Sequence, residues 1–226
     1  EYVCLGAGIH SQENFPVVTT INQALLDGKV VADKQEIEPG SHELEQVHWV
    51  HHDQVAYIFP EAVNARLENQ TRTGSWYDIS KQSDTPTEPI EKDVFLLYLS
   101  HGKMPNNANY AYVVKPNIEA GEVKQYQQDL PVEILQNTAK VQAVKHGSMG
   151  LIQIVFHEPG ELEIDQGLTI ASVDPGLVMI QTDQDQNIKK ITVADPSRQL
   201  TSMNLIVTAP FLTTSEGVEY FWDEER

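Results

Sequence analysis

Short apolar runs separated by turn-forming residues dominate the chain, and the periodicity of an amphipathic helix is scarce. Asp27-Gly28, Pro39-Gly40 and Asp174-Pro175-Gly176 are among the turn signals. Many short strands at such spacing predict an all-β fold built from sandwiches. The predicted strands cover 17–21, 47–50, 55–59, 94–99, 110–114, 134–144, 151–156, 177–182, 188–193 and 203–209. One short polar helix is predicted over 119–128.

Two of the predicted strands are apolar at every position. In 55–59 (VAYIF) and in 110–114 (YAYVV), both sets of alternate residues are apolar. Because alternate side chains point to opposite faces of a sheet, both faces of these strands must be covered. This pattern favours three or more stacked sheets over a simple two-sheet sandwich. The segment 188–193 (IKKITV) carries two lysines, which is typical of an outer or edge strand.

A change in composition divides the chain. The stretch 118–131 is mostly polar and ends in Pro131, and the strands after it are shorter with denser turns. We therefore predict a larger multi-sheet antiparallel assembly over 1–125 and a smaller β-sandwich over 126–226. The 226 residues supply enough apolar side chains for two cores.

The formal net charge of −18 argues against nucleic acid and anionic membranes as partners, since both require clustered Lys and Arg. No apolar run approaches the roughly 20 residues that span a bilayer. Cys4 is the single cysteine, which excludes a disulfide within the chain. The sequence opens inside a strand-like run (EYVCL) without a basic-then-apolar leader, so we expect a fragment whose secretion signal, if it has one, lies upstream.

Histidines and acids gather at 48–53 as His48, His51, His52 and Asp53. They carry atoms that bind metals. On a strand, however, the pair His48 and His52 points away from the pair His51 and Asp53. We therefore favour a strand end that leads into a turn. His101 could act as an acid or a base, but no partner is evident in the sequence, and a structural role is favoured there too.

No nucleophile elbow, P-loop or dinucleotide-binding glycine pattern occurs. Glu161 and Glu163 share one face of a strand-like segment and could bind a hard cation such as calcium, although a solvated face is favoured. Arg66, Arg72 and Trp76 lie in NARLENQTRTGSW, the segment best suited to a sugar. Arginine binds carboxylates and sulfates, and tryptophan offers a flat ring. The same segment also fits a hairpin turn anchored by a buried tryptophan.

Five segments together resemble the β-sandwich portion of bacterial polysaccharide lyases of the chondroitin AC, hyaluronate and xanthan lyase family (polysaccharide lyase family 8). The second half of the chain resembles that family's small C-terminal β domain. The segments follow the family's order, and they are EYVCLGAGI at 1–9, VVTTINQ at 17–23, WVHHDQVAYIFP at 49–60, TGSW at 73–76 and HGKMPNNANYAYVVKPN at 101–117.

The resemblance implies a central β super-sandwich followed by a C-terminal β-sandwich, with an α/α toroid on the N-terminal side. Such enzymes cleave uronate-containing polysaccharides by β-elimination. Their catalytic Asn, His, Tyr and Arg lie on the toroid, so no residue of this chain is assigned a catalytic role. The chain alone is expected to be inactive, with an anionic polysaccharide as the substrate of the intact enzyme. A secreted or periplasmic bacterial location is expected.

The resemblance also implies a structural calcium ion, with Glu1, Tyr2 and a carboxylate further along, either Glu158 or Glu161, as its ligands. Arg66, Arg72 and Trp76 are the predicted substrate contacts. A free-standing carbohydrate-binding or adhesion module is the main alternative. A third hypothesis is that the chain is a purely structural β domain that stabilises a larger assembly.

Overall fold

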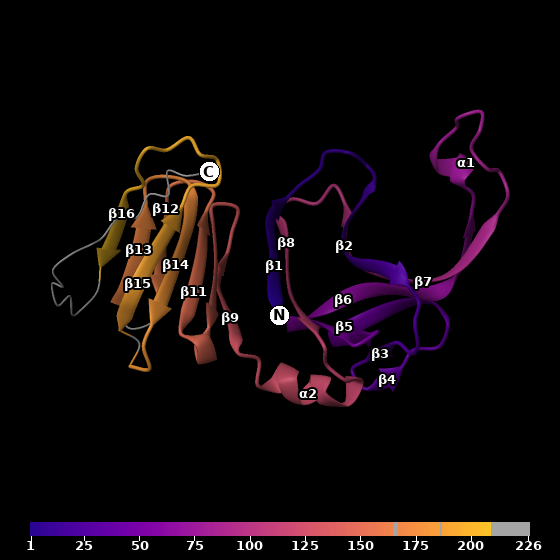
Figure 1. Ribbon diagram of the computed structural model, residues 1–226, viewed down its shortest axis with the longest axis horizontal. Helices are drawn as coiled ribbons and strands as arrows, with labels where there is room; N and C mark the ends of the chain where they lie inside the picture. Colours follow the sequence, from indigo (N-terminus) through magenta and orange to yellow (C-terminus); the bar gives the residue numbers. More distant parts are fainter. Residues whose placement is uncertain (165–166, 186, 209–226) are drawn as a thin grey trace.

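The computed structural model describes residues 1–164, 167–185 and 187–208. Figure 1 shows two β bodies joined by a helix, here called the larger and the smaller sandwich. Every strand pairing in the described residues is antiparallel, so the predicted all-β fold class is confirmed. The two helices are α1 (Trp76–Ile79) and α2 (Ala120–Gln128), and a 3₁₀ turn, η1, covers Gly147–Met149.

The larger sandwich is one hydrogen-bonded sheet that folds back on itself around a 20-residue strand, β6. The first part of β6 pairs with β8, and its last part pairs with β7. The neighbouring β5 has register shifts at the corner, where Gln46 has a φ of 52°. Such a bulge lets a strand bend from one layer into the next. The strands are β1 (Tyr2–Ile9), β2 (Pro16–Leu25), β3 (Val31–Ala32), β4 (Gln35–Glu36), β5 (Gly40–His52), β6 (Val55–Gly74), β7 (Ile90–Lys103) and β8 (Ala108–Pro116).

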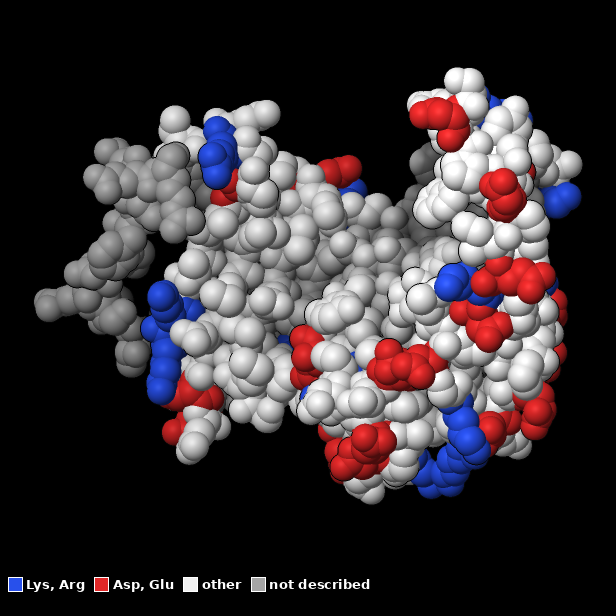
Figure 2. All heavy atoms as spheres, turned by 45° about the vertical axis from the view of Figure 1, so that its right-hand side comes forward, with Lys and Arg blue, Asp and Glu red and all other residues white. Residues whose placement is uncertain are grey.

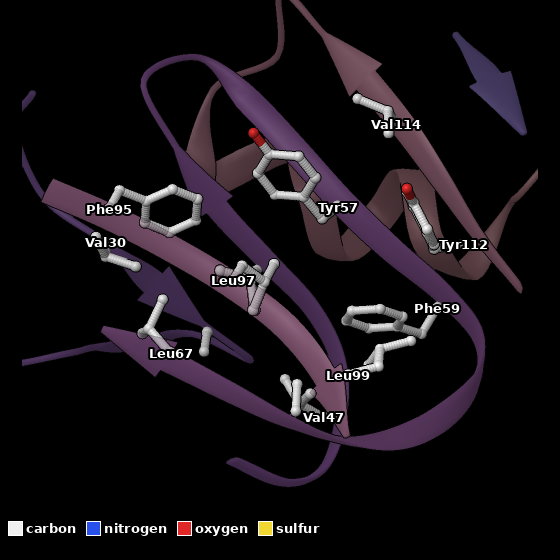
Figure 3. Packing of buried hydrophobic residues seen from close by; sticks show 13 residues of the cluster. Val30, Val47, Tyr57, Phe59, Leu67, Phe95, Leu97, Leu99, Tyr112 and Val114 are labelled. Atoms are coloured by element: carbon white, nitrogen blue, oxygen red, sulfur yellow. The ribbon is translucent and has the colours of Figure 1, made fainter. Parts of the chain in front are cut away.

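The main core of the larger sandwich lies between the two layers of the folded sheet. Figure 3 shows Leu67, Phe95 and Leu97 from one layer together with Tyr57 and Phe59 from the other. Phe59, Leu67, Phe95 and Leu97 have no solvent-exposed surface. Burying side chains of this size contributes about 1.5–3 kcal/mol each, which makes this core the main source of the body's stability.

A helix, rather than a third sheet, covers the second apolar face of 55–59. Ala56 and Ile58 point away from the main core and pack in a separate cluster with Val113, Ile118 and Val123. For 55–59, α2 thus takes the place of the third stacked sheet that the pattern favours. The apolar pattern required a cover but did not specify which kind of element would provide it.

The predicted helix over 119–128 is confirmed as α2. The Glu122 carboxylate accepts a hydrogen bond from the backbone N–H of Glu119 at 3.1 Å, which stabilises the first turn. Val123 buries the helix against the larger sandwich. The predicted domain boundary, between residues 125 and 126, falls within this helix.

The smaller sandwich faces a five-stranded sheet against a three-stranded one. Strands such as Leu151–Phe156 alternate between buried and more exposed residues, as expected for a body with one core. Phe156, Ile154 and Ile180 are fully buried at its centre. The strands are β9 (Val132–Asn137), β10 (Val141–His146), β11 (Leu151–Phe156), β12 (Gly160–Ile164), β13 (Leu168–Ser172), β14 (Gly176–Thr182), β15 (Ile188–Ala194) and β16 (Leu205–Thr208).

Two predictions about the smaller sandwich have opposite outcomes. The segment 188–193 is the edge strand β15, as expected from its lysines. The run 134–144 is a hairpin, not one strand, because a turn separates β9 from β10. Thr138 closes that turn with hydrogen bonds between its hydroxyl and the N–H and C=O of Val141, each 3.0 Å long. In the sequence, the polar residues Asn137, Thr138 and Lys140 interrupt the apolar run at this turn.

Candidate functional site

The histidine-rich segment 48–53 forms the end of β5 and a tight turn into β6. Asp53 and Gln54 have φ values of 47° and 59°, which suit the two central positions of a two-residue hairpin turn. His51 and His52 point to opposite faces of the strand and are both buried. The predicted strand end and turn are therefore confirmed.

Each buried histidine of this turn has a structural partner. His51 Nε2 donates to the Ile118 carbonyl at 2.9 Å, which ties the turn to the start of α2. His52 Nε2 accepts a hydrogen bond from the Asp27 N–H at 3.0 Å, and its ring stacks on Phe95. Burial lowers the pKa of His52 and favours the neutral ring that this hydrogen bond requires. These contacts hold both rings in place, and the buried Nδ1 of His51 is left without a hydrogen-bond partner among the described residues.

His101 is also held by packing. Its Nε2 lies 2.8 Å from Thr19 Oγ1, and its ring lies 6.4 Å from that of Tyr110. Burial lowers the pKa of His101. The Tyr110 ring packs over Gly6, where an added Cβ would approach the ring to 2.2 Å, so no side chain fits at that position. His101 therefore belongs to an aromatic cluster between β7 and β8.

The predicted sugar-binding residues do not form one cluster. Arg66 and Arg72 share a face of β6, but six residues separate them by roughly 20 Å. Arg66 pairs with Glu43 at 2.5 Å, and Arg72 pairs with Glu68. Trp76 lies on α1 at the tip of the arm formed by the ends of β6 and β7 (Figure 1).

The exposure of Trp76 excludes one of the two interpretations of the segment NARLENQTRTGSW. Its residue surface is 57% exposed, so a hairpin turn anchored by a buried tryptophan is wrong. The neighbouring Tyr77 and Ile79 are exposed as well. The Asp78 carboxylate accepts a hydrogen bond from the Ser75 N–H at 2.9 Å, which holds the short helix in place. The structure thus presents an ordered aromatic tip.

The predicted calcium ligands lie apart. The Glu1 carboxylate pairs with His146 at 2.5 Å, at one end of β10. Glu161 follows Gly160, which packs on Val141 at the opposite end of β10. Five residues of a strand separate those ends by roughly 16 Å. Within the described ranges no group of three or more His, Cys, Asp and Glu could hold a metal ion. In the part of the chain that the structure describes, Glu1 and Glu161 do not converge on one site.

A groove runs between the two sandwiches, and the sequence analysis did not predict it. Its lining includes Tyr2 and Leu5 of β1, Lys115 of β8, Tyr126 of α2 and His146 of β10, and its volume is about 940 Å³. These residues are far apart in the sequence, and only the docking of the two bodies brings them together. No local motif marks them, so no signal in the sequence could have identified the set.

Two family models match the chain in succession. The super-sandwich domain of polysaccharide lyase family 8 matches residues 1–127, and the C-terminal β-sandwich domain of the same family matches residues 133–204. The two matches correspond to the larger and the smaller sandwich.

Among curated relatives, the chondroitinase-AC of Pedobacter heparinus is 34% identical over 200 residues, which is 87% of this chain and 28% of that protein. The xanthan lyase of Bacillus sp. (strain GL1) is 28% identical over 212 residues, covering 88% of this chain and 22% of that protein. The hyaluronate lyase HylB of Enterococcus faecalis is 26% identical, covering 97% and 22%. The chain thus spans about a quarter of the length of these relatives.

A solved structure supports the same family. A chondroitinase AC lyase, whose active site was revealed by enzyme–oligosaccharide complexes, matches 92% of this chain with a TM-score of 0.76 and 29% identity, and the match covers 32% of that enzyme. The family models together cover both sandwiches, and the first alone covers more than half of the chain. The chain belongs to polysaccharide lyase family 8.

Proposed function

We propose that this chain is the β-sheet part of a lyase that cleaves uronate-containing polysaccharides, of the chondroitin or hyaluronan type, by β-elimination. The observation that carries the proposal is the consecutive match of two lyase domains, in family order, across both sandwiches. The names of the relatives support acidic polysaccharides as the substrate class.

The proposed reaction requires a base that removes the C5 proton of a uronate, after which the 4-O bond breaks and an unsaturated uronate is left. A group that neutralises the uronate carboxylate makes that proton easier to remove. Among the described residues, His51 and His52 are buried on structural partners, and His101 is held by Thr19. This supports placing the acid–base chemistry on a helical domain, with the β bodies as its frame.

The test measures the ultraviolet absorbance of unsaturated uronate with chondroitin, hyaluronan and xanthan as substrates. We expect no turnover by this chain alone. We expect turnover when the chain is joined to, or mixed with, the helical domain of its own protein. Turnover by this chain alone overturns the division of labour. Failure of the complete enzyme on every uronate polymer overturns the proposed substrate class.

A secreted or periplasmic location is part of the proposal, because a polysaccharide polymer is degraded where the polymer is. Within the described residues, no helix is long and apolar enough to cross a membrane. Fractionation of the producing cells tests the location, with the protein expected in the medium or the periplasmic extract. Exclusive recovery from the cytosol contradicts it.

The exposed aromatic tip favours a second candidate function, a carbohydrate-binding module. Trp76 and Tyr77 present rings to solvent on a capped turn, and tryptophan rings stack on sugars. In this case Trp76→Ala abolishes retention on immobilised polysaccharide and leaves the circular dichroism spectrum and the unfolding midpoint unchanged. Absence of retention by the wild-type chain on a broad sugar array removes this candidate.

A further inference from the structure

Two polar contacts fix the walls of the groove between the sandwiches. At one end of β1, Glu1 pairs with His146 at 2.5 Å. Near the other end, the Asn137 side chain donates to the carbonyls of Gly6 at 3.3 Å and Tyr110 at 3.0 Å. The stretch of β1 between these contacts lines the groove opposite β10 and β11. Its walls are therefore held by specific contacts at both ends.

The groove differs in charge from the rest of the chain. Acidic residues outnumber Lys and Arg by 33 to 15 overall, and Figure 2 shows acidic side chains gathered over the larger sandwich. The ionisable side chains of the lining are Lys115, Lys145, His146, Glu1, Tyr2 and Tyr126. The one carboxylate among them, that of Glu1, is already paired with His146. In an acidic protein, this lining favours a ligand that carries negative charge.

The uncharged part of the lining suits a sugar. Gln153 contributes an exposed amide group, which can donate to and accept from hydroxyl groups. The Gln142 amide is already bonded to Asn137 and His157. Tyr126 contributes a ring, over which the Lys115 ammonium lies 5.4 Å from the centroid. Apolar side chains from β1, β9, β10, β11 and the neighbouring turns form the rest of the surface. A volume of about 940 Å³ lies at the upper end of the range of ordinary ligand sites, so several linked rings fit better than one.

We propose that this groove binds an acidic oligosaccharide. Lys115 and Lys145 face its carboxylate or sulfate groups, Tyr126 contacts a ring, and Gln153 binds hydroxyls. The choice of a uronate-containing sugar rests on the proposed function. The two lysines, the tyrosine ring and the exposed amide of the lining do not depend on it. The smaller sandwich thereby takes part in holding the polymer instead of only supporting its neighbour.

The experiment titrates the full chain with chondroitin and hyaluronan hexasaccharides, and with a neutral hexasaccharide, by isothermal titration calorimetry at low salt. The variant K115Q/K145Q removes two cations from the groove. The matched control K29Q/K103Q removes two cations from the larger sandwich outside the lining. We expect about tenfold weaker binding for each groove cation removed, because a charge-assisted hydrogen bond contributes about that factor.

A second variant protects the test against misfolding. Gln153 is exposed on β11, and Q153E places a negative charge in the groove. We expect Q153E to unfold at the wild-type urea midpoint and to bind the acidic sugars at least about tenfold more weakly, through like-charge repulsion. Equal losses in the groove and control variants, equal affinity for the neutral sugar, or no binding at all overturn the proposal.

The two proposals fail separately. If the complete enzyme cleaves uronate polymers while the groove variants bind like the wild type, the groove proposal falls and the proposed function stands. If the groove variants lose binding selectively while the complete enzyme leaves every uronate polymer intact, the groove is supported and the proposed function falls.

Discussion

The two sandwiches differ in what they bury. In the described residues, the larger sandwich buries the polar side chains of His51, His52 and Asn69, whereas the smaller sandwich buries only Ser172. Both have a continuous apolar core. In the larger body the buried polar groups each bind the backbone of a distant segment. The smaller body relies on alternation along short strands.

This difference follows from topology. The larger sheet must bend at a corner and hold a helix against its outer face, and apolar packing alone does not specify such irregular contacts. A buried hydrogen bond has directional requirements, and a buried donor or acceptor without a partner costs about 1–3 kcal/mol. Buried polar groups therefore favour one arrangement of the segments that they join. The smaller sandwich contains regular hairpins, in which the pattern of side chains sets the register.

The largest expected effect is that of removing a core ring from each body. Phe95→Ala deletes a fully buried ring that stacks on His52 and Tyr57, and Phe156→Ala deletes its counterpart in the smaller core. Each should lower the free energy of unfolding of its own body by about 3–5 kcal/mol. Hydrogen exchange followed by mass spectrometry should show lost protection in one body only. Equal loss in both bodies would show that they unfold as one unit.

The next largest effect is expected from removing one buried polar side chain from each body. Asn69→Ala removes an acceptor from the Gly40 N–H and a donor from the Ile37 carbonyl. We expect a loss of about 2 kcal/mol in the larger body. Ser172→Ala removes one hydroxyl, which donates to the Asp174 carbonyl, and should cost about 1 kcal/mol. Urea unfolding curves give both values. Similar costs at both sites would contradict the contrast between the bodies.

Acid should affect the larger body through His52. Burial depresses the pKa of His52 below its usual 6.5, so the unfolded chain takes up the proton first. The contribution to stability is present above pH 6.5 and is lost as the pH falls through 6.5 toward the lowered pKa. The urea midpoint should therefore drop less between pH 7 and pH 5 in His52→Gln, whose amide oxygen can still accept from Asp27. An identical drop in the variant and the wild type excludes His52 as the source.

The smallest effect is expected at the junction. Asn137→Ala removes the hydrogen bonds to Gly6 and Tyr110 but exposes no core residue. We expect about 1 kcal/mol or less in the unfolding of either body, together with a broader distribution of particle dimensions in small-angle X-ray scattering. An unchanged scattering curve would show that the remaining contacts suffice to hold the two bodies.

Much of the fold could be predicted because strands and turns are local. The run 55–59, the turn at Asp53 and the helix over 119–128 all follow from neighbouring residues. The cover over Ala56 and Ile58 could not be predicted, since an apolar face looks the same whether a helix or a sheet packs on it.

The candidate site residues were harder to predict, because their partners also come from distant parts of the sequence. Arg66 and Arg72 look available in the sequence, but Glu43 and Glu68 neutralise them across and along the strands. The pair of Glu1 and His146 joins residues that are 145 positions apart in the sequence and belong to two different bodies. Such partners are set by tertiary docking, which no short motif records.

The seating of α2 determines where the molecule can be divided. Ile118 and Val123 belong to the same cluster as Trp49, so the helix is part of the larger body although it leads to the smaller one. A cut before residue 118 would remove Ile118, Val123 and Val132 from this cluster and expose its apolar surface. A cut just after Gln128 keeps Ile118 and Val123 and removes only Leu130 and Val132. Exchange of the C-terminal sandwich between such proteins by recombination would disturb the fewest core contacts if the junction lies just after α2.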